Sequence, residues 1–388
     1  MKMPRGTASP AVMKLAQPAA EPLVIARVDA IPVELPLAKP MFMAGVKIER
    51  AENLLVRIEA RNGAVGWGEA ASATVTGELL PGMVAAVERY LAPLLIGQDA
   101  LQHAMLTARC AQALRHNRGT KAAVEMALLD LVGRHLRVPV SDLLGGALRE
   151  SVRPMWLLGN RTAAEDIAEA RRKQEDGFNF FKLKVGVRSV EEEIEETLAL
   201  REALGEDVTL CADANMGYTL PIAGHYIART AGARLLFLEQ PLRNDDLAGM
   251  AALARTSPIP LGADQAIDSV KDILDYQRAG AAAGVNLKTR RLGGVSVTVH
   301  AGRICETLGL SIDLACKVAE SSISAAALVQ IGAVLANLDW GISPTNYYLA
   351  VDTVREPLHP QHGVVAVTRG YGLGVEVLED VIARYRVC

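Results

Sequence analysis

Several charged residues follow short apolar runs at regular intervals and could form one catalytic site. Asp213, Glu239 and Asp264 end the runs "VTLCAD", "LLFLE" and "IPLGAD". Lys288 ends the next run, "GVNLK", and the steps between these four residues are 26, 25 and 24 residues. A single Asp after an apolar run is often only the N-cap of the next helix. Three consecutive apolar runs that each end in an acid instead indicate that the three acids occupy equivalent positions in the fold.

Three carboxylates gathered at one place predict a bound cation. Each pair about 4 Å apart repels by about 4 kcal/mol at an effective dielectric of about 20, so protons or a metal ion must offset the repulsion. A ligand set made only of oxygen suits a hard cation. We therefore predict a Mg²⁺ site, with Mn²⁺ as the second choice, whose ligands are Asp213, Glu239 and Asp264.

The stretch "FNFFKLKVG" carries two lysines, Lys182 and Lys184, that leave the same face of a strand. A solvated strand face is the simple interpretation. If that face points into a site, two ammonium groups about 7 Å apart repel by about 2.4 kcal/mol, which favours a neutral amine on one of them. We predict that Lys184 is the base that removes a proton beside a carboxylate, that Lys182 stays charged next to that carboxylate, and that Lys288 faces them.

These residues need elements that bring their strand ends together. From about residue 22 the sequence predicts a three-stranded meander with a turn at 61–63, followed by helices over 83–95, 100–115 and 119–136. Short apolar runs then alternate with helical segments, which indicates parallel strands. The predicted strands are 153–159, 178–184, 207–213, 235–239, 259–263, 284–288, 310–315 and 335–339.

Eight strands joined by helices predict an α/β fold, a TIM-like (β/α)7β barrel with an N-terminal α+β capping domain. An open doubly wound sheet is the alternative, but no Gly-rich phosphate fingerprint follows the first strand. In a barrel the second and sixth strands face each other, so their lysines would stand on opposite walls. The expected divisions are a disordered tail at 1–21, the capping domain at 22–145, the barrel at 146–365 and a C-terminal segment at 366–388 that packs on the cap.

Composition excludes several other classes of protein. The net charge is -3 and the pI is near 6.2, which gives no basic surface for nucleic acid. The five cysteines are scattered, which argues against a disulfide framework and favours a cytoplasmic location. The apolar stretches are too short to cross a membrane. We expect a small-molecule substrate and, from helical surfaces with few charges, a homo-oligomer.

The chain resembles the enolase superfamily and, within it, the muconate lactonizing enzyme subgroup, over about residues 22–388. The motifs that carry the resemblance are "AVEMALLDLVGRHLRVPVSDLLGG", "KLK", "DAN", "EQP", "GAD", "NLKTRRLGG" and "GLGVEV". The resemblance implies that Lys184 and Lys288 are opposed acid/base residues and that Lys182 contacts the substrate carboxylate. It also implies a substrate contact at Asn215, and two cap loops, 39–47 and 72–78, that close over the distal part of the substrate. The Met, Ala, Gly and Thr residues of these loops indicate that this part is modestly apolar.

Two positions depart from the family pattern. Gln265 follows Asp264 where the family usually has Glu, which removes a negative charge beside the site. Residues 337–339 read Asn-Leu-Asp where dipeptide epimerases of the family carry Asp-x-Asp, so only Asp339 remains as a predicted substrate contact. Trp340 could present an aromatic face to a substrate or could belong to the core.

The resemblance implies a Mg²⁺-dependent isomerase that removes a proton alpha to a substrate carboxylate through a metal-stabilised enediolate. Cycloisomerisation, as in muconate cycloisomerase, and racemisation or epimerisation are the expected outcomes. A dehydratase acting on an acid sugar or a hydroxy amino acid would use the same site. A non-catalytic carboxylate-binding protein is the remote alternative.

Overall fold

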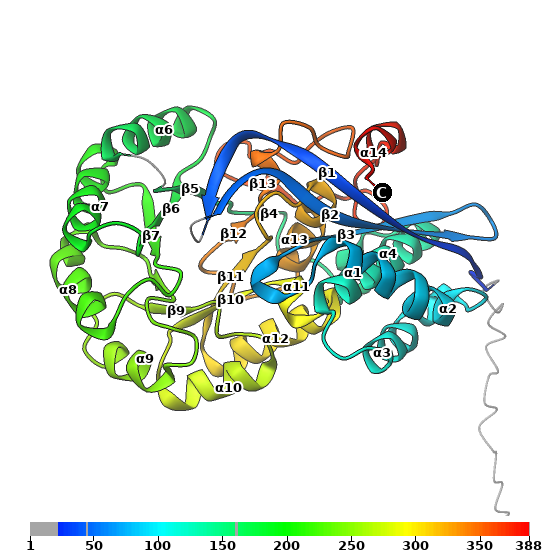
Figure 1. The fold of residues 1–388 in the computed structure, drawn as a ribbon, viewed down its shortest axis with the longest axis horizontal. Coiled ribbons are helices and arrows are strands. Elements are labelled where there is room, and N and C mark those ends of the chain that lie inside the picture. The colour runs from blue at the N-terminus through cyan, green and yellow to red at the C-terminus, as the bar shows by residue number, and fades with distance from the viewer. Residues whose placement is uncertain (1–21, 44–45, 160–161, 388) are drawn as a thin grey trace, which may run out of the picture.

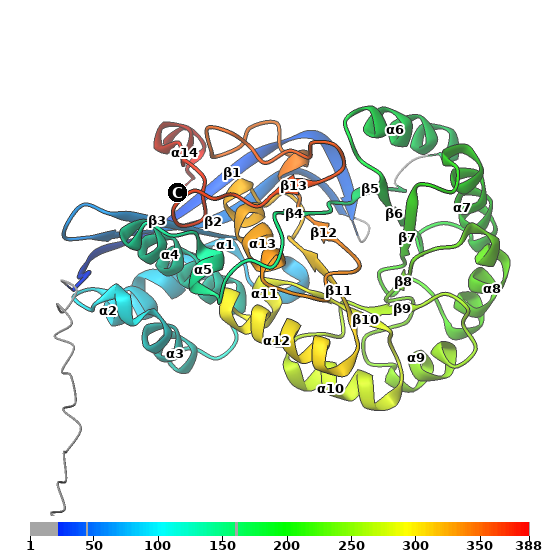
Figure 2. The same cartoon turned by 180° about the vertical axis from the view of Figure 1, so that it is seen from behind.

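The computed structural model describes residues 22–43, 46–159 and 162–387, and the predicted tail at 1–21 lies outside this range. A small sheet with its own helices lies beside a ring of helices that surrounds a parallel barrel (Figures 1 and 2). Among the described residues, none of the helices combines the length and the apolar character needed to span a bilayer.

The N-terminal part is an antiparallel meander packed on helices, as predicted. Its strands follow the order β1-β2-β3. The predicted helix over 83–95 is divided by a π-helical turn, while the other two form almost as expected. The elements are β1 (Ile25–Met43), β2 (Val46–Ala60), β3 (Val65–Ala71), η1 (Thr74–Thr76), α1 (Leu80–Ala86), η2 (Val87–Leu91), α2 (Ala92–Leu95), η3 (Ala100–Gln102), α3 (His103–Ala113), α4 (Arg118–Leu136) and α5 (Val140–Leu143).

Both faces of this sheet are buried. On β2, Leu54 and Val56 pack in a core formed with the cap helices, whereas Leu55 belongs to the large core that continues into the barrel. The alternation of strand side chains produces this division. On β3, Gly68 lets helix α4 approach closely, because a Cβ at that position would stand 2.0 Å from the carbonyl oxygen of Ala123.

The barrel has eight parallel strands in the order β12-β11-β10-β9-β8-β7-β6-β5. Its first and last strands meet where the amide of Met155 donates to the carbonyl of Ile342 at 2.8 Å and the amide of Ile342 donates to the carbonyl of Arg153 at 2.9 Å. The predicted fold class is therefore confirmed. The strands are β5 (Trp156–Leu158), β6 (Phe180–Lys184), β7 (Thr209–Asp213), β8 (Leu238–Glu239), β9 (Leu261–Ala263), β10 (Gly284–Leu287), β11 (Ser311–Ala315) and β12 (Ile342–Ser343).

Helices connect these strands and form the outer ring (Figure 1). Two of them begin with a capping box, in which Thr162 and Ser189 exchange hydrogen bonds with the third helical residue. The helices are α6 (Ala163–Glu175), α7 (Val190–Leu204), α8 (Leu220–Thr230), η4 (Ala231–Ala233), α9 (Leu247–Ala254), α10 (Val270–Ala279), α11 (Thr289–Leu292), α12 (Val295–Leu308) and α13 (Ser322–Ala333).

The position of the eighth strand was predicted wrongly. Residues 335–339 form turns, and the strand that completes the barrel, β12, begins at Ile342. Leu335 and Leu338 are buried because they pack beside glycines on α12 and α13, Gly302 and Gly332. Their apolar pattern therefore reflects burial against helices rather than extended backbone.

Trp340 is part of the core at the amino-terminal end of the barrel. Its ring stacks on Phe237 with centroids 4.1 Å apart, in a cluster that includes Phe180. Gly262 and Gly284 leave room for it, since a Cβ at Gly284 would lie 2.6 Å from the indole. Trp340 thus closes the end of the barrel opposite the catalytic face, and the aromatic-contact interpretation is wrong.

The C-terminal segment contacts the cap. Val387 donates its amide to the carbonyl of Pro32 at 3.0 Å, and Leu373 donates to the buried Asp130 on α4 at 2.7 Å. The remaining elements are β4 (Ser151–Val152), η5 (Asn346–Tyr348), β13 (Val365–Ala366), which pairs with β4, and α14 (Glu379–Tyr385).

Candidate active site

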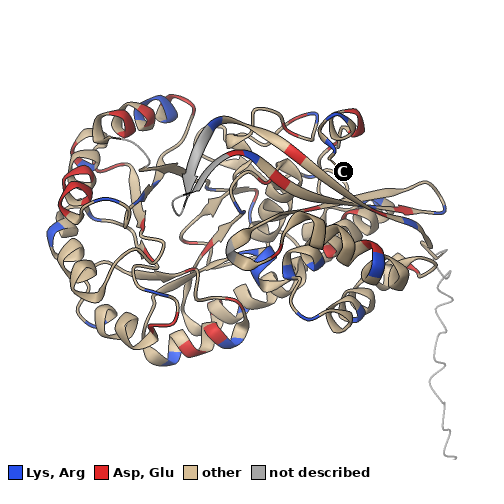
Figure 3. Ribbon diagram, in the orientation of Figure 1, with Lys and Arg blue, Asp and Glu red and all other residues tan. Residues whose placement is uncertain are grey.

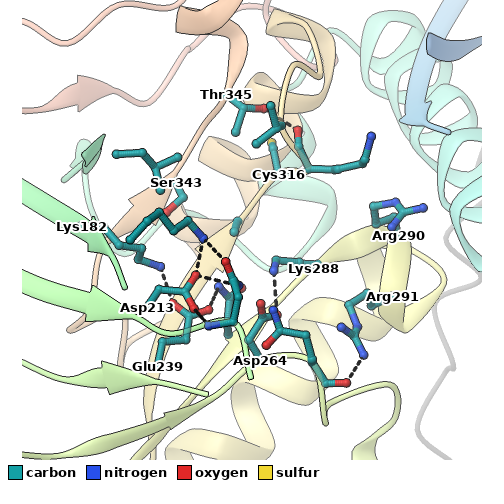
Figure 4. Close-up of a pocket in the computed structure, with 18 of the residues that line it drawn as sticks. Lys182, Asp213, Glu239, Asp264, Lys288, Arg290, Arg291, Cys316, Ser343 and Thr345 are labelled. Carbon is teal, nitrogen blue, oxygen red and sulfur yellow. Dashed lines mark hydrogen bonds and ion pairs between the residues drawn. The ribbon is translucent and has the colours of Figure 1, made fainter. Parts of the chain in front are cut away.

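A cavity of about 210 Å³ lies at the carboxyl ends of the barrel strands. Charged positions occur on the barrel strands within the ring of helices (Figure 3). Figure 4 shows the side chains that face this cavity. The lining residues include Thr76, Lys182, Lys184, Asp213, Asn215, Glu239, Asp264, Gln265, Asn286, Lys288, Arg290, Arg291 and Lys317.

Strand β6 turns its two lysines into this cavity and its apolar residues outward. Lys182 and Lys184 line the cavity, while Phe181 and Leu183 belong to the large core under the helices. A parallel strand between two covered faces has no solvated side, so the polar set of "FFKLK" must point inward. The simple interpretation as a solvated strand face is wrong.

The three acids stand at the ends of neighbouring strands. Asp213 on β7 pairs in register with Glu239 on β8, and Glu239 pairs with Gly262, two residues before Asp264. Gln240 fixes the last two strand ends relative to each other, because its side-chain oxygen accepts from the amide of Asp264 at 2.9 Å. Gln240 was not among the site residues predicted from the sequence.

Each of the three carboxylates is turned toward a different lysine. Lys182 donates to Glu239 at 2.5 Å, Lys288 donates to Asp264 at 2.6 Å, and Lys184 donates to Asp213. Lys184 also donates to the side-chain oxygen of Asn215 at 2.8 Å (in Figure 4, dashed lines join several of these groups). The structure therefore brings together all six of these residues, the three predicted catalytic lysines and the three predicted metal ligands.

Burial and charge shift the protonation of this cluster. Burial, and after it the Asp213 carboxylate, raise the pKa of Glu239 to about 8. Burial opposes the charge of Lys182, but Asp313 and Glu239 outweigh it and raise the lysine's pKa well above its ordinary value, which favours the charged ammonium. Burial also opposes ionisation of Asp264, but Lys288 prevails and lowers its pKa.

Two buried residues of the site were missed by sequence analysis. Asp313 on β11 accepts from Lys182 at 2.6 Å, and Asn286 on β10 donates to Asp313 at 3.0 Å and to Glu239 at 2.9 Å. These four side chains form one polar layer below the cavity mouth. The available signal was a single polar residue inside an otherwise apolar strand, "SIDLA" or "GVNL".

The structure does not bring Asp339 to the cavity, so the predicted substrate contact is corrected. Asp339 lies in a turn before β12, where its carboxylate accepts from the hydroxyl of Ser311, the first residue of β11, at 3.4 Å. It is exposed at the amino-terminal end of the barrel because the eighth strand begins later than predicted. Asn337 also bonds there, to the carbonyl of Leu310.

The first expected cap loop is described only in part, whereas the structure describes the course of the second. Residues 39–43 and 46–47 continue strands β1 and β2, and residues 44–45 lie outside the described chain. Lys39, where β1 reaches the barrel, pairs with Glu169 on α6 at 2.8 Å. From the second loop, 72–78, Thr76 lines the cavity and accepts from Arg290.

The donor set at the strand ends fits a hard divalent cation. Its three carboxylates come from neighbouring strand ends, and their mutual repulsion is one cause of the raised pKa of Glu239. As the side chains stand, no three His, Cys, Asp or Glu within the described part of the chain are spaced to hold a metal ion. Each of the three carboxylates instead contacts a separate ammonium group.

The family of the chain follows from comparison with known proteins. A family model described as enolase C-terminal domain-like matches residues 165–381, and the N-terminal domain model of the mandelate racemase / muconate lactonizing enzyme family matches residues 25–145. The chain belongs to the enolase superfamily. The resemblance to the muconate lactonizing enzyme subgroup is confirmed. Muconate cycloisomerases of this superfamily generally use a divalent metal ion.

Similar proteins match nearly the whole chain. Muconate cycloisomerase 1-1 of Acinetobacter lwoffii is 30% identical over 370 residues, which cover 94% of this chain and 96% of that protein. A chloromuconate cycloisomerase of Cupriavidus pinatubonensis is 29% identical, covering 92% and 98%. The crystal structure of a muconate lactonizing enzyme from Pseudomonas fluorescens complexed with muconolactone has a TM-score of 0.89 at 30% identity, covering 94% and 99%.

Proposed function

We propose that this enzyme moves a proton alpha to a substrate carboxylate between lysines on two sides of a metal site, with cycloisomerisation as its leading reaction. One observation carries the proposal. Lys184 ends β6 and Lys288 directly follows β10, and the acids Asp213, Glu239 and Asp264 stand at the carboxyl ends of the three strands between them. The predicted enzyme class, an isomerase, is confirmed by relatives named as cycloisomerases.

Each residue has a defined part in this proposal. Lys184 removes or returns the proton on one side of the substrate carbon, and Lys288 does so on the other side. Lys182 stays charged below the substrate carboxylate, where it binds Glu239 and Asp313 of the polar layer. Asn215 orients Lys184 through their hydrogen bond. These lysines also contact the acids, so a substrate and its cation would exchange these contacts for new ones.

Asp213, Glu239 and Asp264 would hold the metal ion, for which we propose Mg²⁺ first and Mn²⁺ second. When bound, the ion supplies positive charge for the negative charge that develops on the substrate carboxylate. The pairing of each acid with a lysine supports this assignment, because all three are already arranged to meet cationic charge. A cytoplasmic location and a homo-oligomeric state stay predictions.

The proposal is tested by hydrogen exchange at the carbon next to the carboxylate. We expect the enzyme with Mg²⁺ to exchange the α-hydrogen of muconolactone with solvent deuterium, and Lys184→Ala and Lys288→Ala each to lose about 10²-fold or more of this rate. Lys271→Ala is the matched control, since Lys271 is 78% exposed on α10 and pairs with Asp275 rather than with a residue of the cavity. Exchange that survives both active-site substitutions would contradict the assignment of the bases.

Metal binding is tested separately by calorimetric titration with Mg²⁺. The wild-type chain should bind the ion, and Asp213→Ala should abolish the signal, because it removes one of three carboxylate ligands. If the wild-type chain gave no signal, a carboxylate-binding protein without catalysis would be the better interpretation. Circular dichroism of each variant confirms that it is folded.

A further inference from the structure

Lys182 contacts one carboxylate more than the other two lysines of the site do. Its ammonium pairs with Glu239 at 2.5 Å and with Asp313 at 2.6 Å. Within the described chain, the ion pairs of Lys184 and Lys288 each involve a single acid, and both of those acids are proposed metal ligands. Asp313 is therefore a fourth carboxylate at the site, beyond the three that the proposed ligand set uses.

Asp313 lies deeper in the barrel than the proposed ligands. It is the third residue of β11, is 1% exposed, and pairs in register with Asn286 on β10. Asp213 and Glu239 are instead the last residues of their strands. The described residues that line the cavity include Lys182 and Asn286 but not Asp313. Asp313 therefore acts on the site through these two neighbours rather than by touching the substrate.

The Lys182 ammonium is buried and needs anionic partners. The side chain is 3% exposed, and an ammonium left there without an acceptor would carry a large desolvation cost. In the proposed function, however, Glu239 is a metal ligand. A cation at that carboxylate would repel the ammonium that now contacts it. Lys182 therefore needs a second carboxylate if Glu239 is to bind an ion.

Asp313 has the capacity to be that second carboxylate. Its Oδ2 atom accepts from Lys182 and, at 3.0 Å, from the side-chain amide of Asn286. Its Oδ1 atom is buried and has no hydrogen-bond partner in the described structure, although both oxygens of a carboxylate can accept. The same amide of Asn286 donates to Glu239 at 2.9 Å, so it fixes the two acids relative to each other.

We infer that Asp313 is a positioning residue that retains the Lys182 ammonium when Glu239 binds the cation. This inference rests on the proposed function, which makes Glu239 a metal ligand. Lys182 exchanges its hydrogen bond to Glu239 for a fuller contact with Asp313, so the ammonium is paired both before and after the ion binds. Lys182 thus stays beneath the substrate carboxylate without competing for the metal ligand.

Calorimetric titration with Mg²⁺ tests the inference. In Asp313→Asn, Glu239 is the remaining carboxylate partner of Lys182, so we expect Mg²⁺ to bind at least about tenfold more weakly than in the wild-type chain. Adding Lys182→Met to Asp313→Asn removes the competing ammonium and should restore the affinity to within about threefold of wild type. A second substitution would not reverse mere damage to the fold, and circular dichroism checks that each variant is folded.

A crystal structure of the wild-type chain with Mg²⁺ measures the position of the ammonium directly. It should show Nζ of Lys182 at hydrogen-bond distance from Asp313 and no longer at that distance from Glu239. This result separates the inference from a general effect of one negative charge, which would weaken Mg²⁺ binding in Asp313→Asn without moving Lys182 in the wild-type chain. The measurement needs no variant, so it decides the question even if Asp313→Asn does not fold.

Asp339→Asn is the matched control, because it is the same substitution at an exposed position at the opposite end of the barrel and should leave Mg²⁺ binding unchanged. Unchanged affinity in Asp313→Asn would overturn the inference. So would a double variant that binds no better than Asp313→Asn, or Lys182 still bound to Glu239 in the crystal with Mg²⁺. A wild-type chain that binds no Mg²⁺ would instead contradict the proposed metal site, and this inference with it.

Discussion

At the scale of single residues, the site consists of charges that balance one another across strand ends. Opposing influences act on the protonation of Glu239. Burial and the neighbouring Asp213 favour its protonated form, whereas its contact with Lys182 favours the carboxylate. Such a group changes its protonation when a cation arrives, since the ion favours the carboxylate form. The polar layer of Asn286 and Asp313 beneath it keeps Lys182 charged and fixed in place.

Binding of Mg²⁺ should therefore depend on pH in a direction set by Glu239. Burial and Asp213 raise its pKa to about 8, so below that pH the proton must leave before the ion binds. We expect the affinity to fall by up to about tenfold for each pH unit from about pH 8 to about pH 6, and to level off above about pH 8.5.

Calorimetry at several pH values in buffers of different ionisation enthalpy checks this prediction, because it also counts the released proton. Asp339→Asn is the control, since it removes a carboxylate at the opposite end of the barrel and should leave the profile unchanged. An affinity that does not vary over this range would show that Glu239 is already ionised without the ion.

Residues of the site were predictable where their position in a strand is regular. Lys182 and Lys184 follow the two-residue period of a strand, and the three acids end their strands. Asp313 and Asn286 lie inside strands, where one polar residue gives no sign of its partners. Their role depends on Lys182 reaching them across the barrel, which is a tertiary contact.

At the scale of elements, one large side chain packed against two glycines fills the amino-terminal end of the barrel. Trp340 occupies the space that Gly262 and Gly284 leave on β9 and β10. The short strand β12 can then complete the barrel at Ile342. The apolar pattern at 335–339 predicted a strand because a buried turn and a buried strand have similar composition.

Gly284→Ala should destabilise the barrel by about 1–3 kcal/mol, because its Cβ would lie 2.6 Å from the Trp340 ring and 2.7 Å from the carbonyl oxygen of Ser311. Gly224→Ala on α8 is the matched control. It has nothing within 4 Å of its added Cβ and should be stabilised by up to about 1 kcal/mol. Urea denaturation measures both, and equal effects would show that Trp340 can move aside.

At the scale of the whole molecule, one large hydrophobic cluster runs from one face of the cap sheet into the barrel, while the other face packs in a separate core with the cap helices. Cap residues such as Val33 and Leu55 belong to the same cluster as the apolar faces of β6 and β7. Asp130 on α4 adds a polar connection, since it accepts from the amides of Trp67 and Leu373 and from Arg134. The side chain thus joins the cap sheet, the cap helix and the C-terminal segment.

Asp130→Ala should lower the free energy of unfolding by about 3 kcal/mol or more, because two buried amides lose their acceptor and Arg134 loses its partner. Asp245→Ala, at an exposed pair with Arg243, should change it by less than about 0.5 kcal/mol. Urea denaturation followed by circular dichroism compares them. A small effect for Asp130→Ala would mean that water satisfies these amides after local opening.

The sequence by itself determined the strand and helix rhythm, the six charged residues of the site and their order around the barrel. These features depend on local periodicity, which each segment expresses without its neighbours. Only the tertiary structure decided where the eighth strand begins, that Asp339 faces away from the site, and that Asp313 and Asn286 contact Lys182 and Glu239. Burial and pairing of a charge depend on atoms brought together from distant segments, and no local pattern records them.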